Sequence, residues 1–290
     1  MKLDDQTDSP LPRLAPRPAD SNKGDFGRAL LVGGSRGMSG AIAMAGLATL
    51  RGGAGLVTLA VPQSVQNTVA GFSPCFMTHA LADANGQFTT AAAAEVIEFG
   101  KPATILALGP GLGRSAQLTA FVQQIYRDID KPMVVDADAL FALAEGPAVL
   151  SNPGGPRVLT PHPGEFARFT GKLPKGAQRM PAAAELARRD ASGNTVVVLK
   201  GHQTVVTDGT RYSLNHTGNP GMATGGSGDV LTGIVTALLC QSLTPFDAAR
   251  LAVHIHGLAG DLAAAKLGQV SLIATDLIEF LPLALQSVEN

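Results

Sequence analysis

Cysteine, tryptophan and aromatic residues are scarce in this sequence. Its 290 residues include 2 cysteines, no tryptophan and 4% aromatic residues. Cys75 and Cys240 are far apart, and each has apolar neighbours. We therefore expect two buried thiols, and neither a disulfide framework nor a cysteine-based metal site.

An excess of charge of one sign is also lacking, because the formal net charge is −1. Proteins that bind nucleic acid or an anionic membrane normally carry a basic patch, so neither partner is expected. No apolar run reaches the roughly 18 residues that suggest a membrane-spanning helix. The first residues also contain no apolar segment typical of a secretory signal. We expect a cytoplasmic protein.

What the chain does have is a composition suited to an α/β enzyme, with 45% hydrophobic residues and 34 glycines. Its length is sufficient for a large core. Residues 1–25 are rich in proline and aspartate, and we expect an extended arm that is partly ordered at best. No linker or repeat follows, so residues 26–290 are predicted to form a single domain.

Short apolar runs alternate with helical patterns along this domain. Strands are expected at 29–32, 55–61, 104–108, 133–135, 158–160, 196–199, 205–207 and 212–214. Helices are expected at 40–50, 115–127, 139–144, 229–240, 245–266 and 275–287. The dipeptide Asp208-Gly209 indicates a hairpin turn between the last two strands. The alternation predicts a mainly parallel sheet with helices on both faces.

The most informative segment is 219–231, which reads Asn-Pro-Gly-Met-Ala-Thr-Gly-Gly-Ser-Gly-Asp-Val-Leu. Glycines allow backbone N–H groups to point inward without a Cβ clash, and the following helix adds roughly half a positive charge at its N-terminus. Together they predict a phosphate site. Asp229 falls in the first helical turn, where it can take a proton from a hydroxyl that is being phosphorylated. The simpler alternative, a helix cap, needs one such residue and not the whole run.

Other chemically suggestive groups follow the ends of the predicted strands. They are Gly33-Gly34-Ser35, the run 109–113 (Gly-Pro-Gly-Leu-Gly), Asp136, His162 and Lys200. In open α/β sheets, ligands bind beyond the carboxyl ends of the strands. We therefore expect these groups to belong to one site.

Several of these residues also have a simpler interpretation. Prolines flank His162 on both sides, and we favour a ligand contact over a turn role for its imidazole. Asp136 is equally compatible with holding a magnesium-bound water or a substrate hydroxyl and with a structural role. Asp138 is suited to capping the helix that follows. Lys200 either places its ammonium or backbone near nucleotide phosphates, or is a solvated lysine at a strand end.

Two familiar nucleotide motifs are absent. The glycine-rich run 33–40 follows a strand, but no acidic residue ends the next strand, as a dinucleotide site requires. Neither Tyr126 nor Tyr212 has a lysine four positions later, so a short-chain dehydrogenase is not indicated. No lysine that follows a glycine precedes serine or threonine, which excludes a Walker A loop.

The remaining histidines do not suggest a metal centre. His254 and His256 lie two positions apart in an apolar helical pattern, so they point to different faces and a shared metal is not expected. His79 is expected to be structural or exposed. We assign no metal ligands.

Taken together, the motifs resemble those of the ADP/ATP-dependent NAD(P)H-hydrate dehydratases. The matching stretches run in order from about residue 23 to 280, and they are 33–35, 39–41, 109–113, 135–140, 159–165, 200–204 and 217–229. Ser227 stands where threonine is more usual, which keeps the hydroxyl, and Met38 stands where an aromatic residue is frequent. The resemblance implies a ribokinase-like fold, a three-layer α/β/α sandwich with a mainly parallel central sheet.

The resemblance also implies a role for individual residues. Catalysis would fall to Asp229 with the loop residues Gly226, Ser227 and Gly228. The hydrated cofactor would contact Ala41, Gly111, Gly113, Asp136, His162, Asn219 and Asp229. The adenine nucleotide would contact Lys200, Gly201, His202, Gln203, Thr204 and Gly228.

Members of this family repair nicotinamide cofactors hydrated across the 5,6 double bond of the reduced ring. The resemblance implies phosphorylation of the C6 hydroxyl of (6S)-NAD(P)H hydrate, followed by loss of phosphate. ADP would be converted to AMP, although ATP is also possible, and Mg²⁺ would accompany the nucleotide. Members are often homotetramers. Because about 25 residues precede the first strand, we expect a separate NAD(P)H-hydrate epimerase as functional partner.

Two other functions fit part of the pattern. A small-molecule kinase of the same fold, acting on a hydroxymethylpyrimidine, a thiazole alcohol or a sugar, would share the glycine-rich loop and Asp229. Its product would be a stable phosphate ester, whereas the dehydratase releases inorganic phosphate. A non-catalytic nucleotide sensor would have lost the carboxylate, and Asp229 is present.

Overall fold

The computed structural model describes residues 3–288, so the outer ends of the predicted arm and domain lie outside the described residues. Its strands are β1 (Asp4–Asp5), β2 (Arg28–Val32), β3 (Leu56–Pro62), β4 (Met77–Leu81), β5 (Asp83–Ala84), β6 (Gln87–Phe88), β7 (Ile105–Leu108), β8 (Met133–Val135), β9 (Arg157–Leu159), β10 (Thr195–Leu199), β11 (Val205–Thr207) and β12 (Arg211–Leu214). Every predicted strand is present to within two residues at either end.

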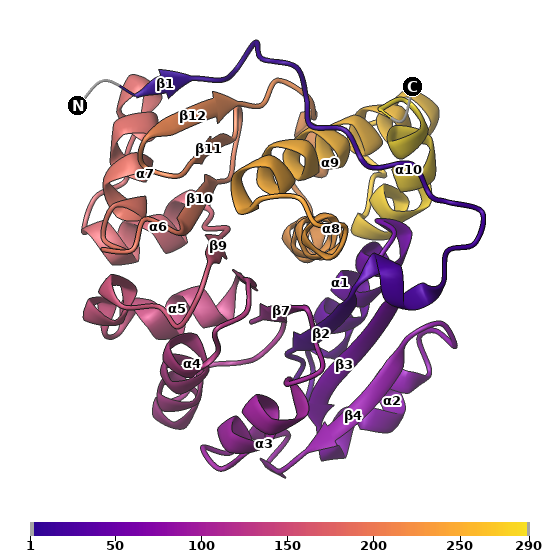
Figure 1. The fold of residues 1–290 in the computed structure, drawn as a ribbon, viewed down its shortest axis with the longest axis vertical. Helices are drawn as coiled ribbons and strands as arrows, with labels where there is room; N and C mark the ends of the chain where they lie inside the picture. Colours follow the sequence, from indigo (N-terminus) through magenta and orange to yellow (C-terminus); the bar gives the residue numbers. More distant parts are fainter. Residues whose placement is uncertain (1–2, 289–290) are drawn as a thin grey trace.

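One sheet contains most of these strands (Figure 1). Its order is β1-β12-β11-β10-β9-β8-β7-β2-β3-β4, and β5 and β6 form a separate hairpin. The strands from β10 through β9, β8, β7, β2 and β3 to β4 pair in parallel. β11 pairs antiparallel with both β10 and β12, around the predicted Asp208-Gly209 turn. The prediction of a mainly parallel sheet is confirmed.

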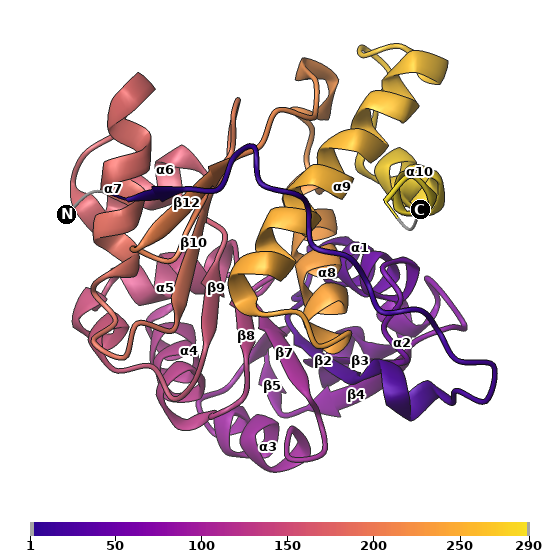
Figure 2. The same cartoon turned by 45° about the horizontal axis from the view of Figure 1, so that its top comes forward.

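Helices cover both faces of the sheet (Figures 1 and 2). They are α1 (Ser39–Arg51), α2 (Gln66–Ala70), α3 (Ala92–Phe99), α4 (Ala116–Asp128), α5 (Asp138–Ala144), α6 (Pro163–Thr170), α7 (Arg179–Ala187), α8 (Ser227–Cys240), α9 (Pro245–Leu267) and α10 (Ala274–Gln286). One apolar core joins the sheet to α1, α8, α9 and α10, and a second joins it to α3, α4, α5 and α7. None of the helices within residues 3–288 is both long and apolar enough to cross a membrane.

Strand β2 shows how the sequence builds two cores from one sheet. Ala29 and Leu31 belong to the core on the α8 side, whereas Leu30 and Val32 belong to the core on the α4 side. Side chains alternate between the faces of a strand, so a strand buried on both faces needs a continuous apolar run.

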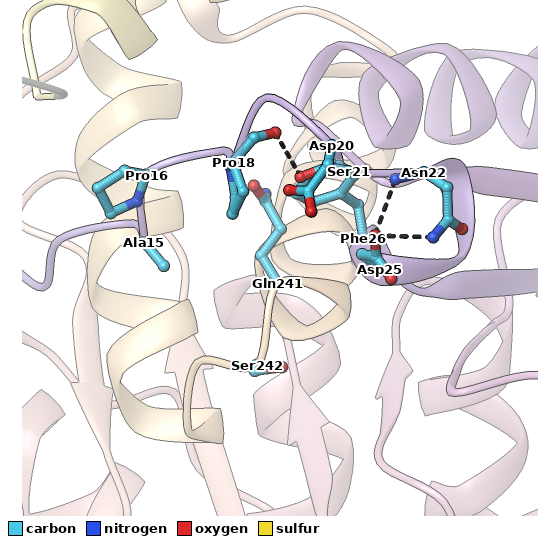
Figure 3. Close-up of a pocket in the computed structure, with 10 residues that line it drawn as sticks. All are labelled: Ala15, Pro16, Pro18, Asp20, Ser21, Asn22, Asp25, Phe26, Gln241 and Ser242. Atoms are coloured by element: carbon cyan, nitrogen blue, oxygen red, sulfur yellow. Dashed lines mark hydrogen bonds between the residues drawn. The ribbon is translucent and has the colours of Figure 1, made fainter.

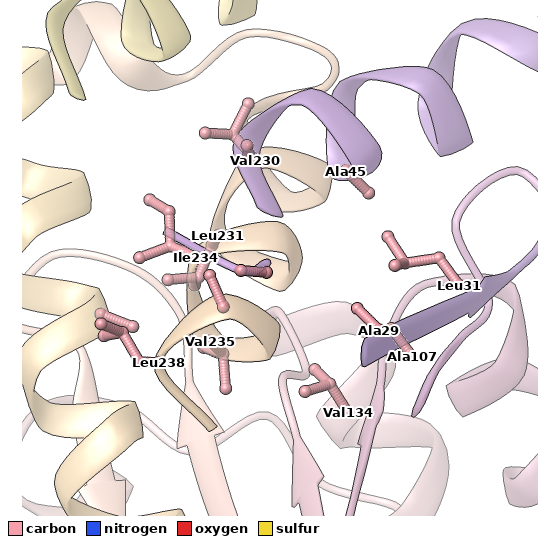
Figure 4. Close-up of a cluster of buried hydrophobic side chains, with 14 of the residues drawn as sticks. Ala29, Leu31, Ala45, Ala107, Val134, Val230, Leu231, Ile234, Val235 and Leu238 are labelled. Carbon is pink, nitrogen blue, oxygen red and sulfur yellow. The ribbon is translucent and has the colours of Figure 1, made fainter. Parts of the chain in front are cut away.

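Helix α8 lies against the middle of the sheet, and α1 packs beside it on the same face (Figure 4). A Cβ at Gly233 would overlap the Ala45 carbonyl and lie 2.6 Å from the Ala48 Cβ of α1. This close approach therefore requires glycine. The packing fixes the N-terminus of α8 above the carboxyl ends of the parallel strands.

The N-terminal arm is held by specific contacts along β12 and α9 (Figure 2). The Tyr212 hydroxyl donates to Asp5 Oδ2 at 2.6 Å. The Arg250 guanidinium donates to the carbonyls of Gln6 and Ser9, each at 2.9 Å. The arm thus has more order than its composition indicates. Its separation from one domain over residues 26–290 stays a prediction.

The cysteine prediction is half wrong. Cys240, the last residue of α8, is buried, and burial raises the pKa of its thiol to about 12. Cys75 is exposed, because it lies in the turn between α2 and β4. Its apolar neighbour Phe76 enters the core, but Phe72 is half exposed, so apolar neighbours alone do not bury a turn residue.

Candidate active site

The glycine-rich loop ends at the first turn of α8. Gly226 occupies the N-cap position with φ 92°, a left-handed conformation that favours glycine. Asp229 is the third residue of the helix, so the alternative that it caps α8 is wrong. Across the described part of the chain, no group hydrogen-bonds to the Asp229 carboxylate. A half-buried carboxylate beside a helix N-terminus is thus left available for chemistry.

Asp136 and Lys200 form a buried ion pair under this turn. Lys200 Nζ lies 2.8 Å from Asp136 Oδ1, and the Thr232 hydroxyl of α8 donates to Asp136 Oδ2 at 2.8 Å. Asp136 is 1% exposed. A Cβ placed at Gly228 would lie 3.1 Å from Lys200 Nζ, so the ammonium lies directly against the start of α8. Lys200 is therefore not a solvated lysine.

These charges set the proton affinity of Asp229. Burial, and then the Asp136 carboxylate, raise the pKa of Asp229 to about 7, while Lys200 acts in the opposite direction. Burial disfavours the Lys200 ammonium, but Asp136 and Glu165 outweigh it and raise the pKa of Lys200. A carboxyl group with a pKa near neutrality is suited to general base catalysis.

His162 has the turn role that we ranked second, and its other ring nitrogen lies near the Glu165 carboxylate. It is the N-cap of α6, where its Nδ1 accepts from the backbone N–H groups of Gly164 at 3.0 Å and Glu165 at 3.3 Å. Because Nδ1 accepts, the proton of the neutral ring must be on Nε2. Burial and then Lys200 lower the pKa of His162, which favours this neutral form. The side chain is 56% exposed, and its Nε2 lies 3.4 Å from Glu165 Oε1.

Glu165 completes this helix start and was not among the predicted site residues. Its Oε2 accepts from the backbone N–H of His162 at 2.8 Å. Burial raises the pKa of Glu165 to about 7, partly offset by Lys200. The signal available in the sequence was the capping-box spacing of His162 and Glu165.

Asp138 holds the second glycine-rich loop and does not cap α5, which corrects the sequence interpretation. Its Oδ2 accepts from Gly113 N at 2.9 Å, and its Oδ1 accepts from Arg114 Nε at 2.7 Å. In the same loop, a Cβ at Gly111 would overlap the Met38 carbonyl and lie 3.0 Å from the Ala41 Cβ. The predicted substrate contacts Ala41 and Gly111 are therefore adjacent.

The predicted nucleotide segment 200–204 is a tight turn after β10. Gly201 has φ 134° and Gln203 has φ 53°. Arg179 of α7 holds the turn by donating to four carbonyls, those of Leu199 at 3.0 Å, Lys200 at 3.1 Å, Gln203 at 3.2 Å and His202. No sequence pattern linked Arg179 to this turn, because the contact crosses some twenty residues and depends on how α7 packs on β10.

Asn219 is placed at the loop that precedes α8. Its side-chain N–H donates to Asp261 Oδ1 at 2.9 Å, and its Oδ1 accepts from Gly221 N at 3.0 Å. Asp261 Oδ2 also accepts from Gly218 N at 2.8 Å. These bonds anchor the loop to α9. They occupy one donor and the acceptor of Asn219, which leaves the other N–H of its amide for a ligand.

A cavity of about 570 Å³ lies elsewhere, between the arm and the turn after α8 (Figure 3). Its lining includes Pro16, Pro18, Gln241 and Ser242. Asp229 is at the opposite end of the 14-residue α8, a helix about 20 Å long. The chemistry-bearing groups are therefore not in this cavity.

The site suits a metal that arrives with the nucleotide better than a metal cage built by the protein. Within residues 3–288, no cluster of three or more His, Cys, Asp or Glu side chains could hold a metal ion. Both Asp136 oxygens already bond to Lys200 and Thr232. Mg²⁺ commonly binds substrate phosphates and water with few protein ligands.

Comparison with known proteins identifies the family of this chain. A family model described as NAD(P)H-hydrate dehydratase matches residues 29–283. The Bifunctional NAD(P)H-hydrate repair enzyme Nnr of Moorella thermoacetica is 46% identical over 287 residues, 97% of this chain and 53% of that protein. Its namesake in Escherichia coli is 40% identical over 271 residues, 92% of this chain and 49% of that protein. The chain spans about half the length of the curated relatives it matches.

Solved structures of similar proteins point to the same family and show its fold. The ADP/ATP-dependent NAD(P)H-hydrate dehydratase from Bacillus subtilis, co-crystallized with ATP/Mg²⁺, is 32% identical with a TM-score of 0.81 over 96% of this chain and 95% of that one. A ribokinase from Thermotoga maritima, 15% identical with a TM-score of 0.55 over 88% of this chain and 99% of that one, is alike in fold alone. The predicted ribokinase-like fold is confirmed. The match over most of the chain establishes that this protein belongs to the NAD(P)H-hydrate dehydratase family.

Proposed function

We propose that this protein dehydrates (6S)-NAD(P)H hydrate to NAD(P)H, using ADP or ATP as phosphoryl donor. The observation that supports this most directly is the half-buried Asp229 carboxylate, which has no hydrogen-bond partner within residues 3–288 and stands at the glycine-rich start of α8. Lys200 adds a positive charge against the same turn. This combination of anion site and base suits phosphorylation of an alcohol.

In the first step, the C6 hydroxyl oxygen of the hydrate attacks the terminal phosphorus of the nucleotide. Asp229 takes the hydroxyl proton, the new O–P bond forms, and the bond to the leaving AMP or ADP breaks. The backbone N–H groups of residues 226–228 stabilise the charge on the transferring phosphoryl group. Mg²⁺, when bound with the nucleotide, neutralises part of the phosphate charge.

In the second step, the ring nitrogen N1 supplies the electron pair that breaks the C6–O bond. Phosphate leaves with the oxygen of the former hydroxyl. Loss of the C5 proton then forms the C5=C6 double bond of the reduced nicotinamide. No oxidant or reductant is needed, and the products are NAD(P)H, inorganic phosphate, and AMP or ADP.

The remaining proposals concern the binding residues, the phosphoryl donor, the oligomeric state and the functional partner. Residues 200–204 and Gly228 would hold the nucleotide, while Ala41, Gly111, Gly113, Asp136, His162 and Asn219 would line the hydrate site. The partly exposed imidazole of His162 suits a polar group of the hydrate such as its carboxamide. We further propose ADP as the preferred donor, a cytoplasmic homotetramer, and an NAD(P)H-hydrate epimerase activity that supplies the (6S) form.

The test follows the oxygen atom of the hydroxyl. Hydrate carrying ¹⁸O at C6 is mixed with protein, magnesium and either ADP or ATP. We expect the reduced-nicotinamide absorbance to rise only with nucleotide, and the label to appear in inorganic phosphate. Label released as water would contradict phosphorylation. If neither nucleotide supports the reaction, and a screen of small alcohols yields a stable phosphate ester, the kinase alternative is correct.

A further inference from the structure

His256 of α9 contacts the residue at which the phosphate loop becomes α8. Its Nε2 lies 2.9 Å from the Ser227 carbonyl oxygen and 3.3 Å from Ser227 Oγ. His256 was considered in the sequence only as a metal ligand, because nothing in the sequence brings it near Ser227, 29 positions earlier.

The contact fixes which nitrogen of His256 carries the proton. Burial lowers the pKa of His256 to about 4, so the ring is neutral near pH 7 and has one N–H. A carbonyl oxygen only accepts, and therefore the proton is on Nε2. This Nε2–H cannot accept a hydrogen bond from the serine hydroxyl. In the portion of the chain that the structure describes, Ser227 Oγ has no other partner, so its hydrogen remains available to a ligand.

Helix α9 holds His256 rigidly in this place. A Cβ at Gly257 would overlap Thr217, and the Thr217 hydroxyl donates to the His254 carbonyl at 2.9 Å. Asp261, one turn further along, anchors the loop at Gly218 and Asn219. Helix α9 thus supports both the loop, through Asp261, and the first residue of α8, through His256.

We propose that His256 is a positioning residue, whose Nε2–H holds Ser227 so that the serine hydroxyl donates to the phosphoryl group bound at the start of α8. This inference rests on the proposed function for the identity of the phosphoryl donor. In this proposal the Ser227 hydroxyl itself binds the phosphoryl group, in addition to the backbone N–H of the same residue.

Paired variants test this positioning role. His256→Gln places an amide N–H near the position of Nε2, whereas His256→Asn places it near Nδ1. We expect His256→Gln to keep most activity, and His256→Asn and Ser227→Ala each to lower kcat about 10- to 100-fold, as for one lost hydrogen bond to a charged group. The matched control is His254→Asn, which should leave kcat unchanged. The His254 side chain lines a cavity beside the N-terminal arm and β12, and only its backbone carbonyl bonds to Thr217.

The double variant distinguishes positioning from general damage. If His256 acts through Ser227, adding His256→Asn to Ser227→Ala should lower kcat by no more than about 2-fold further, because coupled residues are not additive. Effects that multiply would overturn the proposal. Calorimetric titration of Mg-ADP into the wild type, His256→Asn, Ser227→Ala and the double variant gives the coupling between the two residues in nucleotide affinity. That measurement holds even if wild-type protein fails to convert the hydrate, a result that would reject the proposed function alone.

A second measurement needs no variant and no ligand. The ¹⁵N chemical shifts of the His256 ring in the folded wild-type protein report its tautomer. We expect the neutral Nε2–H form between pH 6 and pH 8, since the pKa is about 4. An Nδ1–H form would overturn the proposal.

Discussion

Lys200 Nζ lies 2.8 Å from Asp136 Oδ1, and this bond links the ends of β10 and β8 beneath the first turn of α8. The pair keeps Lys200 charged, because the neighbouring carboxylates raise its pKa despite burial. A permanent positive charge is thereby fixed against the backbone N–H groups that would receive the phosphoryl anion. Asp229, beside the same pair, retains a pKa near neutrality.

Replacing Asp229 by asparagine removes the proposed base while keeping the size of the side chain. We expect kcat to fall by about 10²–10⁴-fold, which is the usual contribution of a general base. The affinity for Mg-ADP should change little, because Asp229 is not proposed to hold the nucleotide. Steady-state kinetics and calorimetric titration measure the two effects. A variant with the wild-type rate would remove Asp229 from the mechanism.

The pH dependence of the rate follows from the same carboxyl group. The pKa of Asp229 is raised to about 7, and the base must be ionised to accept a proton. We expect kcat to rise with pH through about 7 and to level off above it. The measurement is kcat between pH 5.5 and pH 9 with saturating substrates. A profile that is flat from pH 5.5 upward would contradict this assignment.

Asp229 should also make folding less favourable as the pH rises. Its pKa is about 7 in the folded state, against 3.8 as the reference value, so between these pH values the folded protein keeps a proton that the unfolded chain releases. Stability contributed by the protonated group is therefore lost as the pH rises through 7. We expect Asp229→Asn to raise the melting temperature by a few degrees at pH 8 and by much less at pH 4.5. Equal changes in melting temperature at the two pH values would contradict a raised pKa for Asp229.

Gly228 is predicted to be sensitive to substitution because of Lys200. A Cβ at this position would lie 3.1 Å from Lys200 Nζ and 3.6 Å from Asp136 Oδ2, so alanine would push the ammonium by a few tenths of an ångström against its ion pair. We expect Gly228→Ala to weaken nucleotide binding and lower kcat, each by about 10-fold or more, the size of one lost charge-assisted interaction. Gly225→Ala, which would meet no atom within 4 Å, is the matched control with a much smaller effect. Equal losses in the two variants would refute the steric argument.

Arg179 should act on nucleotide binding and hardly on the chemical step. Its guanidinium holds four carbonyls of the turn that follows β10. In Arg179→Gln the turn loses these bonds, and we expect KM for ADP to rise about 10-fold with kcat within about 2-fold, the pattern of lost ground-state binding. Lys175→Gln, which removes an exposed charge just before α7, serves as control. A selective fall in kcat would place Arg179 in the chemistry instead.

Some helices and strands were not predicted from the sequence, and the structure shows why. Helices α6 and α7 are among them. Each carries a proline in its first turn, Pro163 or Pro181, a position where a helix tolerates proline. Strand β4 is at the edge of the sheet and is only partly buried, so it lacks a continuous apolar run. The β5–β6 hairpin contains two residues in each strand, too few for a periodic signal.

The sequence by itself determined the features that depend on neighbouring residues. Buried strands were visible as apolar runs, and the glycines around Ser227 placed Asp229 in a first helical turn. Tertiary structure alone decided which distant groups meet. Lys200 reaches Asp136 across 64 positions, and His256 reaches Ser227 across 29. These contacts depend on the order of the strands and on the packing of α8 and α9, which no local pattern encodes, because the free energy of packing is shared among residues far apart in the chain.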